Sequence, residues 1–200
     1  MRSTLDRLIS WMGLGIAVVL LAAGGMLTWA HNFIGNEVHQ QLSSQAITMP
    51  GGPALTTQDM KDNLGKYAGQ TMTTGPQAKA YANHFILAHM NEAAKGQTYA
   101  QVSAAQMAAA KADPNSAQTQ QLTELKTTLF QGDTLRGLLL YGYAFATIGT
   151  IAGYAAIAAF AGAALMLALA GFGLRHAALA RRGSSVVGPR VSRKAVPHTA

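Results

Sequence analysis

Two long stretches without Asp, Glu, Lys, Arg or His constrain this chain more than any other feature of its sequence. The first covers residues 9–30 and the second covers residues 137–174. At a rise of about 1.5 Å per residue, the first stretch makes a helix of roughly 33 Å, which matches a hydrocarbon core of about 30 Å. The sequence therefore predicts that residues 9–30 form a transmembrane helix.

Tryptophans stand near both ends of the first stretch, at Trp11 and Trp29. Indole rings favour the membrane–water interface, so we assign both as interface anchors. A signal peptide cleaved after Ala30 is the alternative. Because the apolar part of a signal peptide runs about 7–15 residues, the length of this stretch favours an uncleaved anchor.

The second stretch is too long for one crossing, since a helix of residues 137–174 would measure about 57 Å. It contains no Pro and no cluster of Asn or Asp that could turn a hairpin. We therefore expect one continuous helix over residues 137–174 that crosses the membrane at about residues 148–172. Tyr141 and Tyr143 are then expected at the outer interface.

The net charge of +7 is confined to the two tails. Residues 31–136 carry seven basic and seven acidic side chains, residues 1–8 sum to +1, and residues 175–200 carry six bases and no acid. Lys and Arg prefer the cytoplasmic side of a membrane, so both termini are predicted to be cytoplasmic and residues 31–136 extracytoplasmic. A hairpin of two crossings within residues 137–174 would instead place the most basic segment, residues 175–200, outside. The expected location is the plasma membrane.

The basic segment of residues 175–200 has no apolar periodicity and is expected to be disordered. Its first bases, Arg175, Arg181 and Arg182, are expected to face anionic lipid, where each base gains about 1 kcal/mol. Nucleic-acid binding is the other interpretation of such a charge, but no nucleic-acid-reading motif accompanies it. The lipid bilayer is therefore the predicted partner of this segment, and no nucleic acid is expected.

Start and stop signals divide residues 31–136 into short helices. The first membrane helix is expected to continue to about Gln45, and the Pro-Gly-Gly-Pro sequence of residues 50–53 predicts a loop. Further helices are expected to start at Thr57, Gly75, Thr98 and Asp113, and Gly132 with Asp133 is expected to end one helix and cap the long final one. The predicted fold is all-α, with two transmembrane helices flanking an extracytoplasmic helical bundle.

Few residues suggest catalysis or metal binding. Cysteine is absent, and no P-loop, dinucleotide fingerprint or nucleophile elbow occurs. The closest approach to a ligand set is His84, His89 and Glu92, which His31 and His39 could complete only through folding. On an α-helix the two histidines lie about 140° apart, so we expect a partly buried His89, a solvated His84 and no metal site. We expect that the protein binds no cofactor and is not an enzyme. A metal-binding enzyme is the weakest alternative.

Small residues are spaced for close helix packing in the second span. Gly149 and Gly153 form a GxxxG pair, and Ala152, Ala156 and Gly162 extend the pattern. Small side chains let helix backbones approach closely in lipid. The pattern favours packing on the first span, with homodimerisation as the alternative.

Four segments resemble a group of uncharacterised actinobacterial membrane proteins with two spans and an extracytoplasmic helical domain. They are residues 66–70 (KYAGQ), 74–85 (TGPQAKAYANHF), 98–99 and 133–140 (DTLRGLLL), and the likeness covers about residues 5–182. The resemblance implies the same two-span layout and no established activity. Some of that group carry a ring-cleaving dioxygenase label, but this chain offers no iron-binding triad, so no catalytic residue is transferred.

The sequence thus favours a non-catalytic membrane protein whose extracytoplasmic module interacts or assembles with partners in the cell envelope. A protein partner in the membrane or envelope is expected, with a homo-oligomer as one form of it. A ligand-sensing domain that works with a separate signalling subunit is the main alternative, because a helical bundle between two spans is the layout of bacterial sensory domains.

Overall fold

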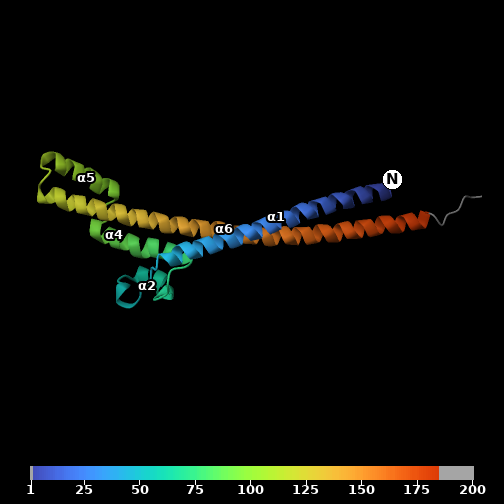
Figure 1. Ribbon diagram of the computed structural model, residues 1–200, viewed down its shortest axis with the longest axis horizontal. Coiled ribbons are helices and arrows are strands. Elements are labelled where there is room, and N and C mark those ends of the chain that lie inside the picture. The colour runs from blue at the N-terminus through green and yellow to red at the C-terminus, as the bar shows by residue number, and fades with distance from the viewer. Residues whose placement is uncertain (1, 185–200) are drawn as a thin grey trace, which may run out of the picture. The chain divides into compact units, whose positions relative to one another are not determined.

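The computed structural model describes residues 2–184 and is helical, with no β-strand in this range. Two helices are long, and the others are short. The elements in chain order are α1 (Arg2–Ser44), η1 (Gly52–Ala54), α2 (Gln58–Leu64), η2 (Gly65–Tyr67), α3 (Gly75–Ala80), the π-helix η3 (Tyr81–Ile86), α4 (Leu87–Ala94), α5 (Tyr99–Ala112) and α6 (Ala117–Ser184) (Figure 1). The predicted all-α class is confirmed.

The chain divides into two compact units, and α1 and α6 each contribute to both. One unit, here the two-helix unit, contains the described residues up to Thr28 and from Tyr154 onward. The other, here the multi-helix unit, contains Trp29–Gly153 and all of the short helices.

Small residues form the seam between the two helices of the two-helix unit. The buried positions recur every seven residues: Ser10, Ala17 and Gly24 on α1, and Ala156, Ala163, Ala170 and Ala177 on α6. A Cβ atom on Gly13 would lie 3.6 Å from Cβ of Ala170, and one on Gly162 would lie 3.3 Å from Cδ1 of Leu20. A seven-residue repeat keeps one face of each helix against its partner, and small side chains allow the close approach.

Large apolar side chains of the two-helix unit point outward. Examples with more than half of their surface exposed are Val18, Val19 and Met26 on α1, and Ile157, Leu165, Leu169 and Phe172 on α6. The most apolar 18-residue windows of α1 and α6 have mean hydropathies of 2.0 and 2.2, and only 17% of each window is buried. Both helices are therefore long and apolar enough to span a membrane, and they differ from the mostly buried core helix of a soluble protein.

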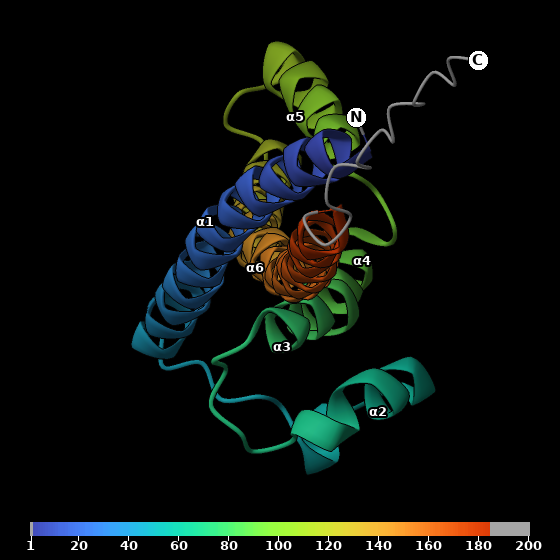
Figure 2. The ribbon, with the colours of Figure 1, turned by 90° about the vertical axis from the view of Figure 1, so that its right-hand side faces the viewer.

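The multi-helix unit has a core of large side chains. Its main cluster brings together α1, α6 and the short elements between them: Leu42, Met49, Leu55, Met60, Leu64, Met72, Ala78, Ala82, Ile86 and Leu139. α3 and α4 lie along α6 (Figure 2). α2 packs on α3 and η3. A smaller cluster of Ala94, Val102 and Leu129 joins α4 and α5 to the first turns of α6.

Two extended segments, residues 47–49 and 70–72, pair with each other. Met49 N donates to the carbonyl oxygen of Gln70 at 2.8 Å, and Met72 N donates to that of Ile47 at 2.8 Å. These bonds form an isolated antiparallel bridge between Thr48 and Thr71. The bridge fixes Met49 and Met72 in the main cluster, where both are buried.

The predicted caps at Thr57 and Thr98 are confirmed, and a further capping box precedes Gly75. Thr98 accepts from Gln101 N, and the Gln101 side chain accepts from Thr98 N, so each satisfies a free donor of the helix start. Thr74 and Gln77 make the same exchange at the start of α3, which begins at Gly75 as predicted.

The expected helix break at Gly132 and Asp133 is wrong, because α6 runs unbroken from Ala117 to Ser184. Its start is capped by Ser116, whose Oγ accepts from Thr119 N at 3.2 Å, and not by Asp113. Gly132 serves packing instead, since a Cβ atom there would lie 2.6 Å from Sδ of Met90 on α4. A missing side chain inside a helix costs only about 1 kcal/mol, so packing decides the local structure.

The helix also continues ten residues past the expected boundary at Leu174. Residues 175–184 are rich in Ala, Leu and Arg, which are strong helix formers, and the first breaker among them is Gly183. The expectation of disorder is thus wrong for residues 175–184, whereas residues 185–200 lie outside the described part of the chain.

Candidate functional site

The two glycines of the GxxxG pair on α6 lie in close contact with α1 of the same chain. Nδ1 of His31 donates to the carbonyl oxygen of Gly149 at 2.7 Å, because a carbonyl can only accept. A Cβ atom on Gly153 would lie 2.9 Å from Nδ1 of His31, and one on Gly149 would lie 3.0 Å from Cγ2 of Ile34. Both glycines are therefore needed for the close approach of the imidazole ring and Ile34.

The other predicted packing residues also lie on inward faces. Ala152 and Ala156 are buried, and Gly162 faces Leu20. The contacts of Gly149, Gly153 and Gly162 are with α1 of the same chain. This arrangement corresponds to the packing on the first span that the sequence favoured.

Three of the four predicted interface anchors point outward. Trp11, Trp29 and Tyr141 are exposed over about two-thirds of their surface, at 64%, 68% and 67%. Trp29 stacks on Phe33, with 5.4 Å between the ring centroids. These orientations leave all three rings free to lie at a membrane interface.

Tyr143 differs because it receives Lys79 of α3. Nζ of Lys79 donates to the Tyr143 hydroxyl oxygen at 3.3 Å and lies 4.5 Å from the ring centroid. This hydrogen bond, then hydrogen bonding with Thr147 and the positive charge of Lys79, lowers the pKa of Tyr143. Tyr143 therefore ties α3 to α6 in addition to its proposed place at the interface. Of the predicted lipid-facing bases, Arg175 is exposed on α6, whereas the side chains of Arg181 and Arg182 lie outside the described part.

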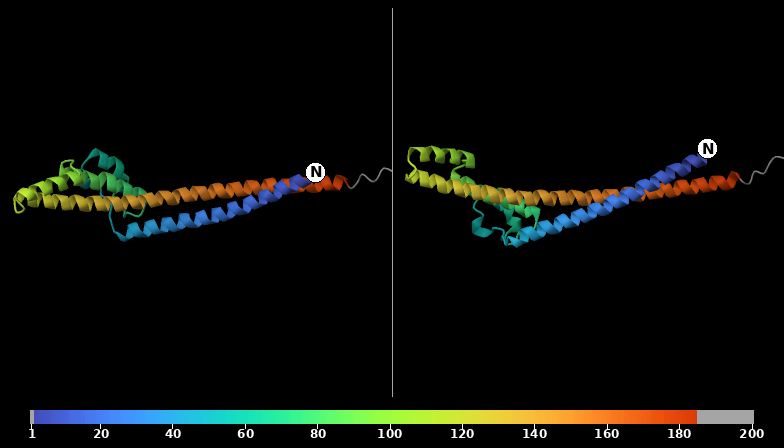
Figure 3. Two further views of the ribbon diagram at one scale, coloured as in Figure 1. Left: turned by 90° about the horizontal axis from the view of Figure 1, so that it is seen from above. Right: turned by 45° about the horizontal axis from the view of Figure 1, so that its top comes forward.

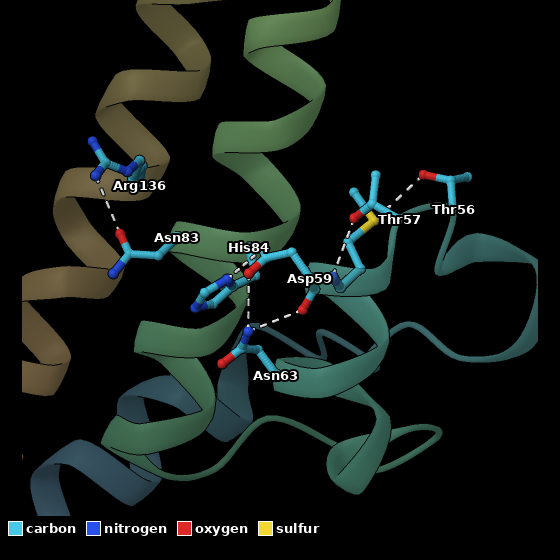
Figure 4. A network of polar contacts seen from close by, with 8 residues as sticks. Thr56, Thr57, Asp59, Asn63, Asn83, His84 and Arg136 are labelled. Carbon is cyan, nitrogen blue, oxygen red and sulfur yellow. Dashed lines mark hydrogen bonds and ion pairs between the residues drawn. The ribbon is translucent and has the colours of Figure 1, made fainter.

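The candidate metal ligands do not converge. Nδ1 of His84 lies 2.7 Å from Oδ2 of Asp59 on α2 (Figure 4). Nδ1 of His89 instead donates to the carbonyl oxygen of Phe85 at 2.8 Å. Glu92 is exposed. Among the residues that the structure describes, no three His, Cys, Asp or Glu side chains are grouped so that they could hold a metal ion.

The exposures of the two histidines are the reverse of the expected ones. The His84 side chain is 28% exposed, and His89 is an exposed residue. The reason is the π-helix over Tyr81–Ile86. Its turn is wider than that of an α-helix, so the residues in it and after it do not face the directions that α-helical spacing predicts. His84 is thereby turned toward α2, and His89 lies against the ring of Phe85 instead of in the core.

The π-helix also holds a partly buried cation. Arg136 Nη2 on α6 donates to Oδ1 of Asn83 at 3.1 Å, while its Nε is buried without a partner (Figure 4). Asn83 and His84 are adjacent in sequence but bind different helices, α6 and α2. The π-helix is therefore the element that links α2 to α6, and π-helical turns are frequent at functional sites.

A groove of about 630 Å³ runs between α1 and α6 inside the multi-helix unit. The α6 wall carries no hydrogen-bonding side chain and consists of Leu135, Leu138, Leu139, Gly142, Phe145 and Ile148. The α1 side combines apolar residues with Glu37, Gln41 and Gln45, which are spaced four residues apart and so lie on one edge. In both views of Figure 3 the C-terminal end of α1, in cyan, is set apart from α6.

A smaller and more polar pocket of about 240 Å³ lies between α1, α6 and the start of α3. His31, His39, Thr73, Thr74 and Thr150 are among its lining residues. Two imidazoles are too few for a structural metal site, which takes four ligands. The pocket offers room for a small polar molecule, but its lining includes no Asp, Glu, Lys or Arg side chain to fix one.

No protein-family model, no curated protein and no solved structure matches the chain. The resemblance to the actinobacterial two-span proteins therefore stays a prediction.

The groove was not predicted, although the sequence carries a signal for it. Leu135, Leu138, Gly142 and Phe145 follow the three- and four-residue spacing of one helix face. The polar repeat at Glu37, Gln41 and Gln45 marks the other edge in the same way.

Proposed function

We propose that this protein is an integral membrane protein whose residues 31–136 form an extracytoplasmic interaction module. In this proposal α1 and α6 cross the plasma membrane, both termini are cytoplasmic, and the crossing part of α6 is about residues 148–172. The module is non-catalytic and assembles with a protein partner in the membrane or envelope.

One observation carries the membrane part of the proposal. The two-helix unit buries only small side chains in its seam and turns its large aliphatic and aromatic side chains outward. In water such a surface would be strongly unfavourable, because exposed apolar area costs about 25 cal/mol per Å². In lipid the same surface costs nothing, and small residues are what drive helix association.

The orientation rests on charge. Residues 31–136 are neutral overall, whereas the segments before and after the two apolar stretches carry all of the positive excess. Since Lys and Arg in short segments are retained on the cytoplasmic side, this distribution favours two cytoplasmic termini.

The absence of cysteine makes the orientation directly testable. Single cysteines are introduced by Asp62→Cys in the proposed outer module and by Thr4→Cys and Ser184→Cys at the proposed cytoplasmic ends. We expect a membrane-impermeant maleimide to label only the Asp62→Cys protein in intact cells and all three after permeabilisation. Ile157→Cys, in the proposed span, is the control that should resist labelling in both states. Labelling of either terminal cysteine in intact cells would overturn the orientation.

Exposed apolar side chains outside the two stretches support the interaction role. Met107 on α5 and Phe130 on α6 are each about 60% exposed, at 61% and 59%, in a part of the chain rich in polar and charged residues. We infer that these two exposed apolar side chains belong to a site of protein contact. Figure 1 shows α5 beside the first turns of α6, so these residues lie on one helical hairpin.

The interaction role is tested by photocrosslinking in the native membrane. A photoreactive amino acid at Phe130 is compared with one at Gln118, an exposed polar position of the same helix. We expect a crosslinked product of defined mass with a second protein at Phe130 and none at Gln118. Equal or absent crosslinking at the two positions would contradict the proposal.

The groove between α1 and α6 favours a second candidate, a ligand-sensing domain that works with a separate signalling subunit. Its volume of about 630 Å³ is that of a small-molecule site. This candidate requires that the crosslinked partner be a signalling protein and that occupation of the groove change the yield of the crosslink.

A further inference from the structure

We propose that the groove between α1 and α6 binds the acyl chain of a membrane lipid, with the lipid's polar end at Glu37, Gln41 and Gln45. This proposal rests on the proposed membrane placement of the two long helices. It assigns a ligand class to a site that the interaction role does not need.

The lining of the groove has the polarity of an amphiphile. One wall, from Leu135 to Ile148 on α6, offers only hydrocarbon, and its backbone groups are engaged in the helix. The facing edge of α1 offers a carboxylate and two amides at a spacing of four, which covers about 12 Å along the helix. A hydrocarbon chain satisfies the first surface, and a headgroup with hydrogen-bond donors satisfies the second.

The position of the groove along both helices gives a lipid direct access. Phe33, the first α1 residue in the lining, lies three positions after the charge-free stretch that ends at Ala30. On α6 the lining from Leu138 to Ile148 belongs to the second charge-free stretch itself. If the helices cross as proposed, the groove opens at the outer face of the plasma membrane. An acyl chain can then enter it sideways from the bilayer without passing through water.

The charge of the groove selects among headgroups. Glu37 is the one charged side chain in its lining. A carboxylate accepts hydrogen bonds from hydroxyl or ammonium groups and repels a headgroup with net negative charge. The expected ligand is therefore a zwitterionic or neutral lipid with donor groups, such as phosphatidylethanolamine, in preference to phosphatidylglycerol.

The test uses the full chain in phosphatidylcholine nanodiscs that contain phosphatidylethanolamine with a photoreactive diazirine on its acyl chain. After irradiation, mass spectrometry maps the lipid adducts. We expect adducts on Leu138 and Phe145 in the groove, in addition to adducts on Ile157, which faces surrounding lipid. The Ile157 adducts report that the helices are in the bilayer.

Gly142→Trp fills the groove, and a Cβ atom at this position makes only an ordinary contact of 3.6 Å with Leu42. We expect it to lower the yield of groove adducts by about tenfold, which corresponds to ~1.4 kcal/mol of binding. Ile151→Trp, at an exposed position of the same helix outside the groove, should leave the yield unchanged. Glu37→Gln, which keeps the side-chain shape, should let phosphatidylglycerol compete as well as phosphatidylethanolamine.

Three results would overturn the proposal. Adducts at Ile157 with none in the groove would show surrounding lipid only and would leave the proposed membrane placement intact. Groove adducts insensitive to Gly142→Trp would also show non-specific lipid. Protein–protein crosslinks from a photoreactive amino acid placed at Leu138 would assign the groove to a second copy or another protein. Loss of adducts at Ile157 as well would instead overturn the membrane placement, so the two failures are distinguishable.

Discussion

The two units of the molecule pack α1 and α6 by different rules. In the two-helix unit the buried residues are small, and the seam consists of Ala, Gly and Ser at intervals of seven. In the multi-helix unit the buried residues are large, and the six largest fully buried side chains all belong to it: Met49, Met60, Leu64, Met72, Leu129 and Val102. The same two helices thus change their packing chemistry along their length.

This difference is what two different solvents would produce. In water, burial of large apolar side chains is the main driving force of folding, so a domain gathers its Met and Leu residues inside. In lipid, burial of such side chains gains nothing, and helices associate where small residues permit close contact. The comparison therefore favours lipid around the two-helix unit and water around most of the multi-helix unit.

The largest expected effect comes from removing a large side chain from the multi-helix core. Leu64→Ala leaves a cavity in a fully buried site and should lower the free energy of unfolding of this unit by about 2–5 kcal/mol. Leu138→Ala is the matched control, because Leu138 is 62% exposed, and it should change stability by less than about 0.5 kcal/mol. Chemical denaturation of the detergent-solubilised protein measures both. Equal effects would contradict the assignment of the core.

Overfilling the small-residue seam should have the next largest effect. Ala163 is fully buried on α6, and its neighbour Ala164 is exposed. Ala163→Leu forces α1 and α6 apart and should cost about 1–3 kcal/mol, whereas Ala164→Leu should be tolerated. The pairing is read from the disulfide of a Gly13→Cys, Ala170→Cys protein, since the two Cβ positions lie 3.6 Å apart.

We expect Ala163→Leu to reduce the yield of this disulfide and Ala164→Leu to leave it unchanged. If both variants cross-link like the parent, the seam tolerates a large side chain, its packing does not depend on small residues, and the comparison between the units fails. If both reduce the yield, the whole surface of α6 is sensitive to volume, and the outward orientation of its large side chains would be contradicted.

Sequence patterns predicted the long helices and most caps because these depend on local chemistry. The length of α1, the capping box of Thr98 and Gln101 and the all-α class follow from hydropathy, spacing and hydrogen-bond donors at helix starts. The continuity of α6 through Gly132 could not be predicted, because it depends on Met90, which lies 42 residues away in the chain. The π-helix could not be predicted either, since no local pattern marks a wider turn.

The candidate site divides in the same way. The small residues Gly149 and Gly153 were found from spacing alone, but their contact with His31 required the fold. The exposures of His84 and His89 were assigned in reverse, because the phase of an α-helix was carried through residues that form a π-helix. The groove was missed because its two walls come from residues about 100 positions apart, such as Leu42 and Leu138.

The smallest expected effect concerns the link between α2 and the π-helix. His84 and Asp59 are paired at 2.7 Å, but the Asp59 side chain is 62% exposed, so water and salt weaken the attraction. Asp59→Asn keeps the shape and one hydrogen-bond acceptor, and it should lower the stability of the multi-helix unit by at most about 1 kcal/mol. Asp62→Asn is the control for loss of one negative charge, because Asp62 lies on the same helix and accepts a hydrogen bond from Gln58 at 2.8 Å in place of a pair with histidine.

Hydrogen exchange of the amides of α2 gives the sharper measurement, because the pair joins α2 to η3 and not to the long helices. We expect Asp59→Asn to speed exchange in α2 and to leave the seam of the two-helix unit unchanged, while Asp62→Asn affects neither. An effect that reached the two-helix unit would mean that the two units unfold together, and the contrast in their packing would then not separate them energetically. An effect confined to α2 would sharpen the contrast between the two units. It would show that α2 opens locally while α1 and α6 stay paired in the two-helix unit.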